Sequence, residues 1–431
     1  MSLEGTQLPR RRPLDGRRVL VGVGAGIAAY KAVEVVRQLA QLGADVHVLM
    51  TRDATRLVGP ATFRELSYNP VITDLFEGHP RLAMTHVTLA RQADLLVVCP
   101  ATADLLGKMA GGLGDDPVTT TYLACTAPVL VVPAMNTAMY HHPAVQANLA
   151  QLAQRGCHIL GPVAGKLATG HEGMGRMVEP HQVVEEVCYL LHPCKDLRGR
   201  KVLVTAGPTR EPLDPVRFLS NRSSGKMGYA IARMARLRGA QVTLVSGPVA
   251  LAPPQGVEVE RVETAQQMHD ACLRHLPAQD AVIMAAAVAD FRPVSPHPEK
   301  LKKQDLFARG QETWSLALTR TPDILAAMAR LRRPHQLLVG FAAETRQLES
   351  MAWQKLREKG VDLVVANDVT RPGAGFEADT NAAVLVDRDG QRTEVPLVLK
   401  EELADRILDW VAAHLPPAPA APAPPSTPPA G

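Results

Sequence analysis

The sequence lacks several signatures of well-defined protein classes. Its 431 residues include only six cysteines, which are scattered without a CxxC pair and fit a reducing compartment better than a disulfide-stapled secreted chain. No apolar stretch reaches the length of a membrane span, and residues 1–18 are Arg-rich without an apolar signal core. The net charge of +4 is too small to indicate nucleic-acid or membrane partners. We therefore expect a soluble, cytoplasmic protein that binds neither.

Two nucleotide-binding fingerprints are also missing. No GxxxxGK[ST] sequence occurs, so the chain is not a P-loop enzyme. The glycine-rich turn Gly22–Gly26 lacks the full GxGxxG spacing, and the next predicted strand ends in Met50-Thr51, where a dinucleotide site would place an acidic residue. These absences favour a mononucleotide at this turn, and they count against a generic NAD-dependent oxidoreductase.

What the sequence contains is an alternation of strand-length apolar runs and helical-period stretches. This alternation predicts an α/β fold with mainly parallel sheets that are covered on both faces. The pattern restarts after the polar segment 190–199, which indicates two Rossmann-like domains. We predict strands at residues 19–23, 46–50, 95–99, 129–132, 201–205, 242–246, 281–287, 337–341 and 363–366, a hairpin of 382–387 and 393–399 around Asp389-Gly390, and helices at 27–42, 225–237 and 401–415.

The domain boundaries follow from the same pattern and from composition. Proline and alanine dominate the end of the chain, which cannot bury a core. We predict a disordered N-terminus at residues 1–16, a first domain at 17–190, a second at 191–415 and a disordered tail at 416–431.

Small or polar residues follow several strands of the first domain, at the edge where doubly wound sheets bind ligands. Glycines after the first strand let backbone N–H groups approach a phosphate at a helix N-terminus. The glycine-rich stretch 165–177 suits a mobile flap over a site, and a plain surface loop fits its composition equally well. The edge residues that we expect to bind a cofactor are Gly24, Ala25, Gly26, Thr51, Ala101 and Thr102.

Three motifs of this domain carry a family resemblance. THVTLARQADLLVVCPATADLLGKMAGG, VVPAMN and the GxGRM flap resemble the phosphopantothenoylcysteine decarboxylases of the flavin-dependent cysteine decarboxylase superfamily. The resemblance implies FMN as cofactor, His86 as the active-site histidine and Asn136 as the residue that holds the substrate carboxylate. Direct loss of CO2 from a cysteine amide leaves an unstabilised carbanion, whereas prior removal of hydride by flavin creates an electron sink.

The flap departs from the family pattern at one position. Bacterial members carry an Ala-Cys-Gly run whose thiol donates the final proton, but this chain has Ala168-Thr169-Gly170. A thiol titrates near ~8.5, and an alcohol is a far weaker acid. Thr169 can position a water relay, and Cys157 on an upstream apolar run is a doubtful replacement, so the identity of the donor stays open. This departure motivates an alternative hypothesis, in which an active ligase is fused to an FMN-binding module that is regulatory or impaired in the final reduction.

Polar and charged residues also gather at the predicted ligand edge of the second domain. A long polar loop at 207–225 leads into a helix, and its hydroxyls and amides are good anion ligands. Asp290 ends another strand, and the run Glu299–Lys303 follows it. A charge run is usually a solvated face, but Lys300, Lys302 and Lys303 could neutralise a triphosphate from this position.

The second domain resembles the bacterial, CTP-using phosphopantothenate–cysteine ligases. The resemblance rests on TAGPTREPLDPVRFLSNRSSGKMG, AAVADFRP, EKLKK, TPDIL, GFAAET and ANDV. It implies that Lys300, Lys302 and Lys303 meet the triphosphate, and that Asn221 helps convert an acyl-cytidylate. It also implies cytidine recognition by Met284, Ala285, Ala286 and Asp290, and a nucleotide site lined by Pro322, Asp323, Ile324, Leu325, Phe341, Lys355 and Lys359.

The two resemblances together imply consecutive reactions of coenzyme A biosynthesis. CTP activates the carboxylate of 4'-phosphopantothenate, with Mg²⁺ and lysines offsetting the negative charge, and the amine of L-cysteine then displaces CMP. The product, 4'-phosphopantothenoylcysteine, is the substrate of the decarboxylase, which gives the fusion a metabolic logic. Family members form homo-oligomers, and we expect the same here.

Overall fold

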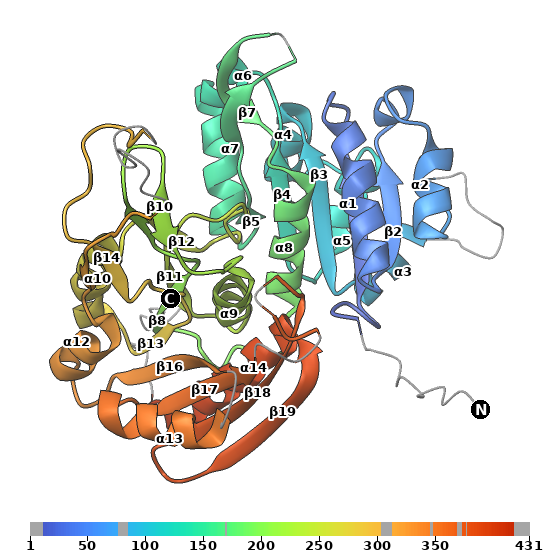
Figure 1. Cartoon of the computed structure of the whole chain (residues 1–431). Coiled ribbons are helices and arrows are strands. Elements are labelled where there is room, and N and C mark those ends of the chain that lie inside the picture. Colours follow the sequence, from blue (N-terminus) through green and yellow to red (C-terminus); the bar gives the residue numbers. More distant parts are fainter. Residues whose placement is uncertain are drawn as a thin grey trace, which may run out of the picture. The chain divides into compact units, whose positions relative to one another are not determined.

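The computed structural model describes residues 12–75, 85–168, 170–302, 313–344, 348–368, 373–375 and 377–417. The chain divides into two compact units, Met1–Pro193 and Cys194–Gly431, and each unit has its own central sheet (Figure 1). Each unit also has its own hydrophobic layers. Within the described ranges, no helix combines the length and the apolar character needed to cross a bilayer.

The first unit is built on a five-stranded parallel sheet in the order β2-β1-β3-β4-β5. Alternate residues of β1 feed opposite layers, because Val19 and Val21 pack with the layer of α1 and α8 while Leu20 packs with the layer of α4 and α5. The strands are β1 (Arg18–Val23), β2 (Asp45–Met50), β3 (Leu95–Ala101), β4 (Val129–Pro133) and β5 (His158–Ile159). The helices are α1 (Ala29–Gln41), α2 (Pro60–Ser67), α3 (Thr85–Gln92), α4 (Ala103–Gly111), α5 (Pro117–Ala124), α6 (Thr137–His141), α7 (Pro143–Gln154) and α8 (Pro180–Leu191).

The second unit is built on an eight-stranded sheet in the order β12-β11-β8-β13-β16-β17-β18-β19, in which neighbouring strands are parallel except for the antiparallel pairs β17–β18 and β18–β19. Val202 and Val204 of β8 pack on the side of α9 and α14, and Leu203 packs on the opposite side with α10. The strands are β8 (Lys201–Ala206), β11 (Gln241–Ser246), β12 (Glu258–Arg261), β13 (Ala281–Met284), β16 (Leu337–Glu344), β17 (Leu363–Asp368), β18 (Thr380–Asp387) and β19 (Arg392–Leu399). The helices are α9 (Lys226–Leu237), α10 (Ala265–His275), α12 (Ile324–Leu331), α13 (Leu348–Lys359) and α14 (Lys400–His414), and two short ribbons pair β9 (Arg210–Pro212) with β10 (Phe218–Ser220) and β14 (Phe291–Pro293) with β15 (Leu318–Arg320).

The predicted α/β fold with mainly parallel sheets is confirmed, and so is the hairpin around Asp389-Gly390. Two details differ. The strand expected at 281–287 already ends at Met284. The glycine-rich stretch 165–177, for which a mobile flap and a surface loop were both considered, lies largely in an antiparallel hairpin of β6 (Val163–Lys166) and β7 (Glu172–Arg176).

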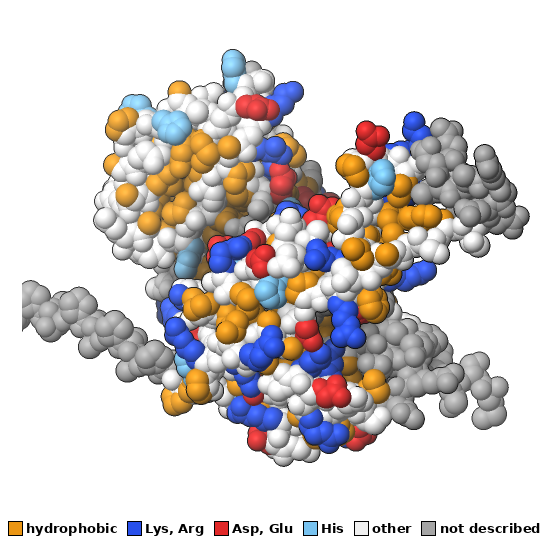
Figure 2. Space-filling model, turned by 60° about the vertical axis from the view of Figure 1, so that its left-hand side comes forward, with side chains coloured by type: hydrophobic (Ala, Val, Ile, Leu, Met, Phe, Trp, Pro, Cys, Tyr) orange, Lys and Arg blue, Asp and Glu red, His pale blue; other side chains and the backbone are white. Residues whose placement is uncertain are grey.

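The surface carries both signs of charge. On the face shown in Figure 2, Lys and Arg side chains are interspersed with Asp and Glu, as the small net charge of +4 suggests.

Candidate active sites

The turn after β1 packs against the turn after β3 so closely that it requires glycine. The Gly24 amide donates a hydrogen bond of 3.1 Å to the Pro100 carbonyl oxygen. A Cβ atom on Gly24 would lie 2.5 Å from that oxygen and 2.7 Å from Leu105 Cδ1. At Gly26 the nearest atom to such a Cβ is Thr102 Cγ2 at 3.4 Å. The turn therefore presents backbone groups at the sheet edge, which suits close approach by a phosphate.

The other predicted flavin-binding residues of the first unit lie at the same edge. The Thr51 amide donates to the Val23 carbonyl oxygen at 3.1 Å. Thr102 caps α4, since its Oγ1 accepts from the Leu105 amide at 3.3 Å. Ala101 is fully buried and its carbonyl oxygen accepts from the Ala134 amide, so Ala101 belongs to the buried support of this edge.

Asn136 is exposed at the N-terminus of α6, directly after β4. Its Oδ1 accepts a hydrogen bond of 2.9 Å from the Ala138 amide. This bond fixes the side-chain amide, so that its N–H groups are the part left to meet an anionic ligand. The capping bond of Asn136 is thus compatible with the ligand role that the resemblance implies.

The β6–β7 hairpin docks onto the turn that holds Asn136. The Gly175 carbonyl oxygen accepts from the Met135 amide at 3.0 Å. A Cβ on Gly175, whose φ is 132°, would lie 2.2 Å from the Met135 carbonyl oxygen, and a Cβ on Gly173 would lie 2.4 Å from Thr137 Oγ1. Both glycines are therefore needed for close approach, which places the predicted flap beside Asn136.

A buried lysine, which the sequence analysis missed, anchors the end of this hairpin. Lys31 on α1 is 7% exposed, and its Nζ donates to the Met177 carbonyl oxygen and to Glu179 Oε1, both at 3.1 Å. Arg176 also contacts Glu179 Oε1 at 2.6 Å. Burial raises the pKa of Glu179, but the two cations outweigh it and leave that pKa below its usual value. The sequence signal that could have revealed Lys31 is its position on the apolar face of the amphipathic helix α1.

The remaining residues predicted to act in the first unit are less informative. His86 lies in α3, but its side chain is outside the described part of the structure, and Thr169 lies outside the described residues. Burial raises the pKa of Cys157, whose Sγ lies 3.8 Å from the Tyr122 hydroxyl. Burial also raises the pKa of Cys99 to about 12. Both thiols are thus poorer proton donors than an exposed cysteine.

The second unit contains a cavity of about 850 Å³ that begins where β13 ends and is also lined by residues of β16 and β17. Its floor is the segment that follows β13, and its walls come from the polar loop before α9, from the start of α12 and from α13. Predicted residues that line it are Asn221, Met284, Ala285, Ala286, Asp290, Pro322, Asp323, Ile324, Leu325, Phe341, Lys355 and Lys359.

Three side chains of this cavity have defined partners. Asn221 Nδ2 donates to the Val288 carbonyl oxygen at 2.8 Å, and Lys355 Nζ donates to the Phe341 carbonyl oxygen at 2.6 Å. Lys359 pairs with Asp323, which also caps α12. Burial raises the pKa of Asp323, yet the hydrogen bonds from Lys359 and the Ala326 amide, together with the charges of Lys359 and Lys355, outweigh it, so the pKa is lowered. Asp323 is therefore ionised and holds the ammonium group of Lys359 in an ion pair.

The lysine run behaves differently from its prediction. Lys300 and Lys302 are exposed and do not line the cavity, and Lys303 lies outside the described residues. Between them, the Leu301 amide donates to Asp214 Oδ2 at 3.2 Å, and Asp214 in turn pairs with Arg217. The backbone of the run is thus held at Leu301, while its described lysine side chains face solvent.

Two other lysines, which the sequence analysis missed, line the cavity instead. Lys400 is 5% exposed, and its Nζ donates to the carbonyl oxygens of Gly375 and Ala378. Burial and the nearby Lys226 lower the pKa of Lys400. Lys226 in turn pairs with Asp379 at 2.6 Å. Lys226 stands in the SSGKMG motif and could have been found, whereas nothing in the sequence around Lys400 marks it as part of a site.

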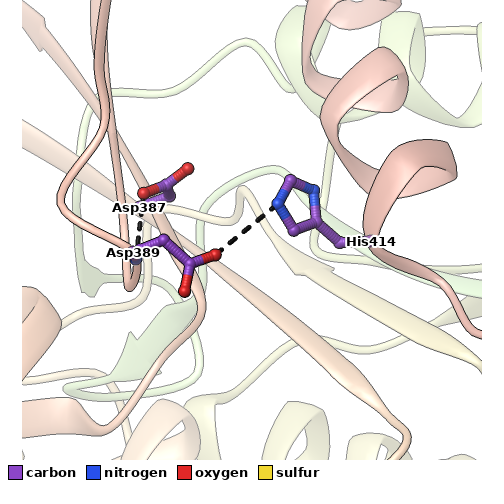
Figure 3. A group of neighbouring side chains, drawn as sticks. All are labelled: Asp387, Asp389 and His414. Atoms are coloured by element: carbon purple, nitrogen blue, oxygen red, sulfur yellow. Dashed lines mark hydrogen bonds and ion pairs between the residues drawn. The ribbon is translucent and has the colours of Figure 1, made fainter.

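One group of carboxylates and a histidine has the proximity of a metal site but serves the fold. Asp387, Asp389 and His414 offer ligand atoms within 4.8 Å of one another (Figure 3). However, Asp387 Oδ1 accepts from the amides of Asp389 and Gln391, and its Oδ2 accepts from Trp410 Nε1 at 3.0 Å. These bonds close the β18–β19 hairpin onto α14, and we assign the group to folding.

Comparisons with known proteins cover both units. A family model described as "Flavoprotein" matches residues 7–192, and one described as "DNA/pantothenate metabolism flavoprotein C-terminal domain" matches residues 197–415. The coenzyme A biosynthesis bifunctional protein CoaBC of Bacillus subtilis is 46% identical over 403 residues, 93% of this chain and 98% of the relative. Its counterpart in Mycobacterium bovis is 47% identical over 413 residues, 93% and 97% of the two chains. A crystal structure of the C-terminal domain of a CoaBC protein is 43% identical over 51% of this chain and 97% of that chain, with a TM-score of 0.43.

Proposed function

The chain belongs to the family of coenzyme A biosynthesis bifunctional proteins, and on that premise we propose which unit performs which reaction. It is an enzyme with a phosphopantothenate–cysteine ligase activity and a phosphopantothenoylcysteine decarboxylase activity. The two family models fall on residues 7–192 and 197–415. We assign decarboxylation to residues 17–190 and ligation to residues 191–415, which keeps the domain boundaries predicted from the sequence.

The observation that carries the ligase proposal is the cavity of the second unit. A carboxylate does not condense with an amine at neutral pH unless it is activated. In our proposal, the phosphopantothenate carboxylate attacks the α-phosphate of CTP, pyrophosphate leaves, and the amine of cysteine then displaces CMP from the acyl-cytidylate. Met284–Ala286 and Asp290 meet the cytosine, and Asn221 stands at the acyl group.

The cationic wall of the cavity fits a triphosphate. Lys355 and Lys359 lie on α13, and Lys226 and Lys400 add two more ammonium groups, one at the start of α9 and one at the start of α14. Partly desolvated ammonium groups stabilise the charge that develops as pyrophosphate leaves. Lys300, Lys302 and Lys303 stay candidates for the same charge, as the resemblance implies.

Magnesium fits this site as a companion of the nucleotide. Among the described residues, the group of three potential ligands noted above lies outside the cavity lining and is committed to folding. Mg²⁺ keeps several waters and commonly binds substrate phosphates with one or two carboxylates. We therefore propose that Mg²⁺ is held chiefly by the triphosphate of CTP.

The edge of the first unit fits a flavin mononucleotide. In the tight Gly24–Gly26 turn, the Gly24 amide donates to the Pro100 carbonyl oxygen and the Gly26 amide to the Gly24 carbonyl oxygen. We therefore propose the Ala25 amide for the phosphate, and Thr51 and Thr102 add hydroxyls. FMN supplies a hydride acceptor for the carbon that bears the sulfur. Asn136 orients the carboxylate of phosphopantothenoylcysteine, the β6–β7 hairpin shields it from water, and His86 handles the first proton. A histidine suits this role because it titrates near neutral pH.

The final reduction needs a proton donor, and the flap cysteine that the family uses is replaced by Thr169 in this chain. Thr169 acts through a water relay, since Cys99 and Cys157 are poor donors. The alternative of a regulatory FMN module is not favoured, because the relatives that match this chain over 93% of its length are bifunctional proteins. We also propose a cytoplasmic homo-oligomer.

The two assignments are tested with the full chain. Supplying CTP, phosphopantothenate and cysteine should release pyrophosphate, and supplying phosphopantothenoylcysteine alone should release CO2. Absence of pyrophosphate would overturn the ligase assignment. CO2 at background level from a flavin-loaded protein would overturn the decarboxylase assignment.

A further inference from the structure

The segment that follows β13 leaves the sheet while it is still largely covered. β13 ends at Met284, and residues 285–290 continue along the floor of the cavity. Covered backbone amides need acceptors, and a strand ladder supplies them only as far as the strand extends. The hydrogen bonds of this segment must therefore come from elsewhere.

Two buried hydroxyls provide acceptors for the segment. Thr205 Oγ1 accepts from the Ala286 amide at 3.1 Å, and Thr209 Oγ1 accepts from the Ala289 amide at 3.0 Å. Between them, the Ala287 amide donates to the Gly207 carbonyl oxygen at 2.9 Å. The backbone of 286–289 is thus fastened along one side by the strand-to-loop segment 205–209.

The carbonyl oxygens are fixed from the other side. Asn221 Nδ2 donates to the Val288 carbonyl oxygen at 2.8 Å, and the Thr321 hydroxyl donates to the Ala289 carbonyl oxygen at 2.6 Å. The Thr321 amide donates to the Asp290 carbonyl oxygen at 3.0 Å. Because amides and carbonyl oxygens of 286–290 are both hydrogen-bonded, the backbone of this segment is held in one conformation, which sets the position of the Asp290 side chain.

Thr205 and Thr209 cannot touch a ligand themselves. Both are 0% exposed, and neither lines the cavity. Any influence on the nucleotide must therefore pass through the backbone that they hold.

We propose that Thr205 and Thr209 are positioning residues for nucleobase selection in the ligase reaction. Cytosine is recognised through an amino group and ring acceptors at fixed spacing, so discrimination depends on where the polar groups of 285–290 stand. The two hydroxyls hold that segment in the geometry that fits CTP. This inference rests on the proposed ligase function and adds the residues that set its base specificity.

The test uses Thr209→Val and Thr205→Val, which keep the side-chain shape and remove the acceptor. An unsatisfied amide makes the segment move, and we expect the KM for CTP to rise about ten-fold in each variant. The ratio of kcat/KM for CTP to that for ATP should fall by a similar factor, whereas the KM for cysteine should change less than about two-fold. Thr209→Ser keeps the acceptor and should retain the preference for CTP.

Thr243→Val is the matched control, because Thr243 is a buried threonine (8% exposed) on β11 of the same unit that does not line the cavity. Its KM for CTP should equal that of the wild type even if its melting temperature falls. An unchanged CTP to ATP ratio in Thr209→Val and Thr205→Val, or an equal loss in Thr243→Val, would overturn the inference. If one valine variant does not fold, the other decides.

Failure of this inference is distinct from failure of the proposed function. If the wild type releases no pyrophosphate from CTP, the ligase assignment itself is wrong. If the wild type is active and the valine variants select CTP as it does, only the positioning role is wrong.

Discussion

The two units use the same architectural edge for different chemistry. In the first unit, backbone segments pack directly against one another at this edge. A Cβ on Gly24, for example, would lie only 2.5 Å from the Pro100 carbonyl oxygen. In the second, four lysines, Lys226, Lys355, Lys359 and Lys400, line one cavity. The difference matches the proposed ligands, because a flavin mononucleotide carries one phosphate that backbone amides can hold, whereas a triphosphate needs compensating charge.

The comparison also shows where each unit should be vulnerable. A site made by close backbone approach is sensitive to a single added methyl group. A site made by charge is sensitive to the loss of one cation and to ionic conditions. Substitutions of each kind should therefore affect one activity and leave the other intact.

The largest expected effect is that of Gly24→Ala. The new Cβ would overlap the Pro100 carbonyl oxygen and Leu105 Cδ1, at 2.5 and 2.7 Å, and should push the first turn away from the phosphate. We expect loss of bound flavin, measured by visible absorbance of the purified protein, and loss of CO2 release. Pyrophosphate release should stay at the wild-type rate.

Gly59→Ala is the control for this substitution. Gly59 has φ of −66° and no atom within 4 Å of an added Cβ. This variant should keep its flavin. Wild-type flavin content in Gly24→Ala would break the account of the first site.

The next effect is that of Lys359→Met in the second unit. Removing one ammonium group from the proposed triphosphate site should raise the KM for CTP by roughly ten-fold to a hundred-fold, the scale of one hydrogen bond to a charged group. It also leaves Asp323 without its partner. CO2 release from supplied phosphopantothenoylcysteine should not change.

Lys201→Met provides the matched lysine control, since Lys201 is exposed at the amino end of β8, away from the cavity. Its KM for CTP should match that of the wild type. Equal KM values for Lys359→Met and Lys201→Met would contradict a charge-based site.

A smaller effect is expected from Thr169→Cys. A thiol is a better acid than an alcohol, so the yield of phosphopantetheine should rise several-fold if proton delivery limits the final reduction. The yield is measured after a fixed time with phosphopantothenoylcysteine as substrate, with Thr169→Ser as the control that keeps an alcohol. An unchanged yield would place the donor elsewhere.

Much of the fold could be predicted because apolar runs and turn residues report directly on buried strands. The run Val19–Val23 gave β1, and Asp389-Gly390 gave the last hairpin. The strand at 281–287 was predicted too long because Ala285–Ala287 is apolar, whereas in the structure the strand ends at Met284 and the Ala286 and Ala289 amides donate to the hydroxyls of Thr205 and Thr209. Hydrogen bonds between distant segments leave no local pattern.

The sites show the same division. Asn221, which lies in a quoted motif, and Lys359, which only the family resemblance implied, could both be placed at the cavity from the sequence. Lys400 could not, because its role depends on burial against Gly375 and Ala378 at the start of a helix that looks like an ordinary amphipathic one. Gly173 and Gly175 suggested a mobile flap, and their fit against Met135 and Thr137 emerged only in three dimensions.

The smallest expected effect concerns the anchor of the β6–β7 hairpin. The pKa of Glu179 is lower in the folded chain than its ordinary value of 4.5. Its ion pairs therefore contribute stability that is fully present above pH 4.5 and is lost as the pH falls through the folded pKa. Glu179→Gln should melt at a slightly lower temperature than the wild type at pH 7, and the gap should close as the pH drops below 4.5. A gap that is independent of pH would show that the ionised carboxylate does not matter.

The central claim, that two separate pockets carry consecutive reactions, is tested most directly by following one labelled carbon through the full chain. The flavin-loaded protein receives phosphopantothenate, CTP and cysteine labelled at its carboxyl carbon, and pyrophosphate and labelled CO2 are measured together. The account predicts pyrophosphate first and then labelled CO2 approaching the same amount, with CO2 abolished by Gly24→Ala and both products reduced by Lys359→Met. Pyrophosphate without labelled CO2 in the wild type, or CO2 release that does not require CTP, would contradict it.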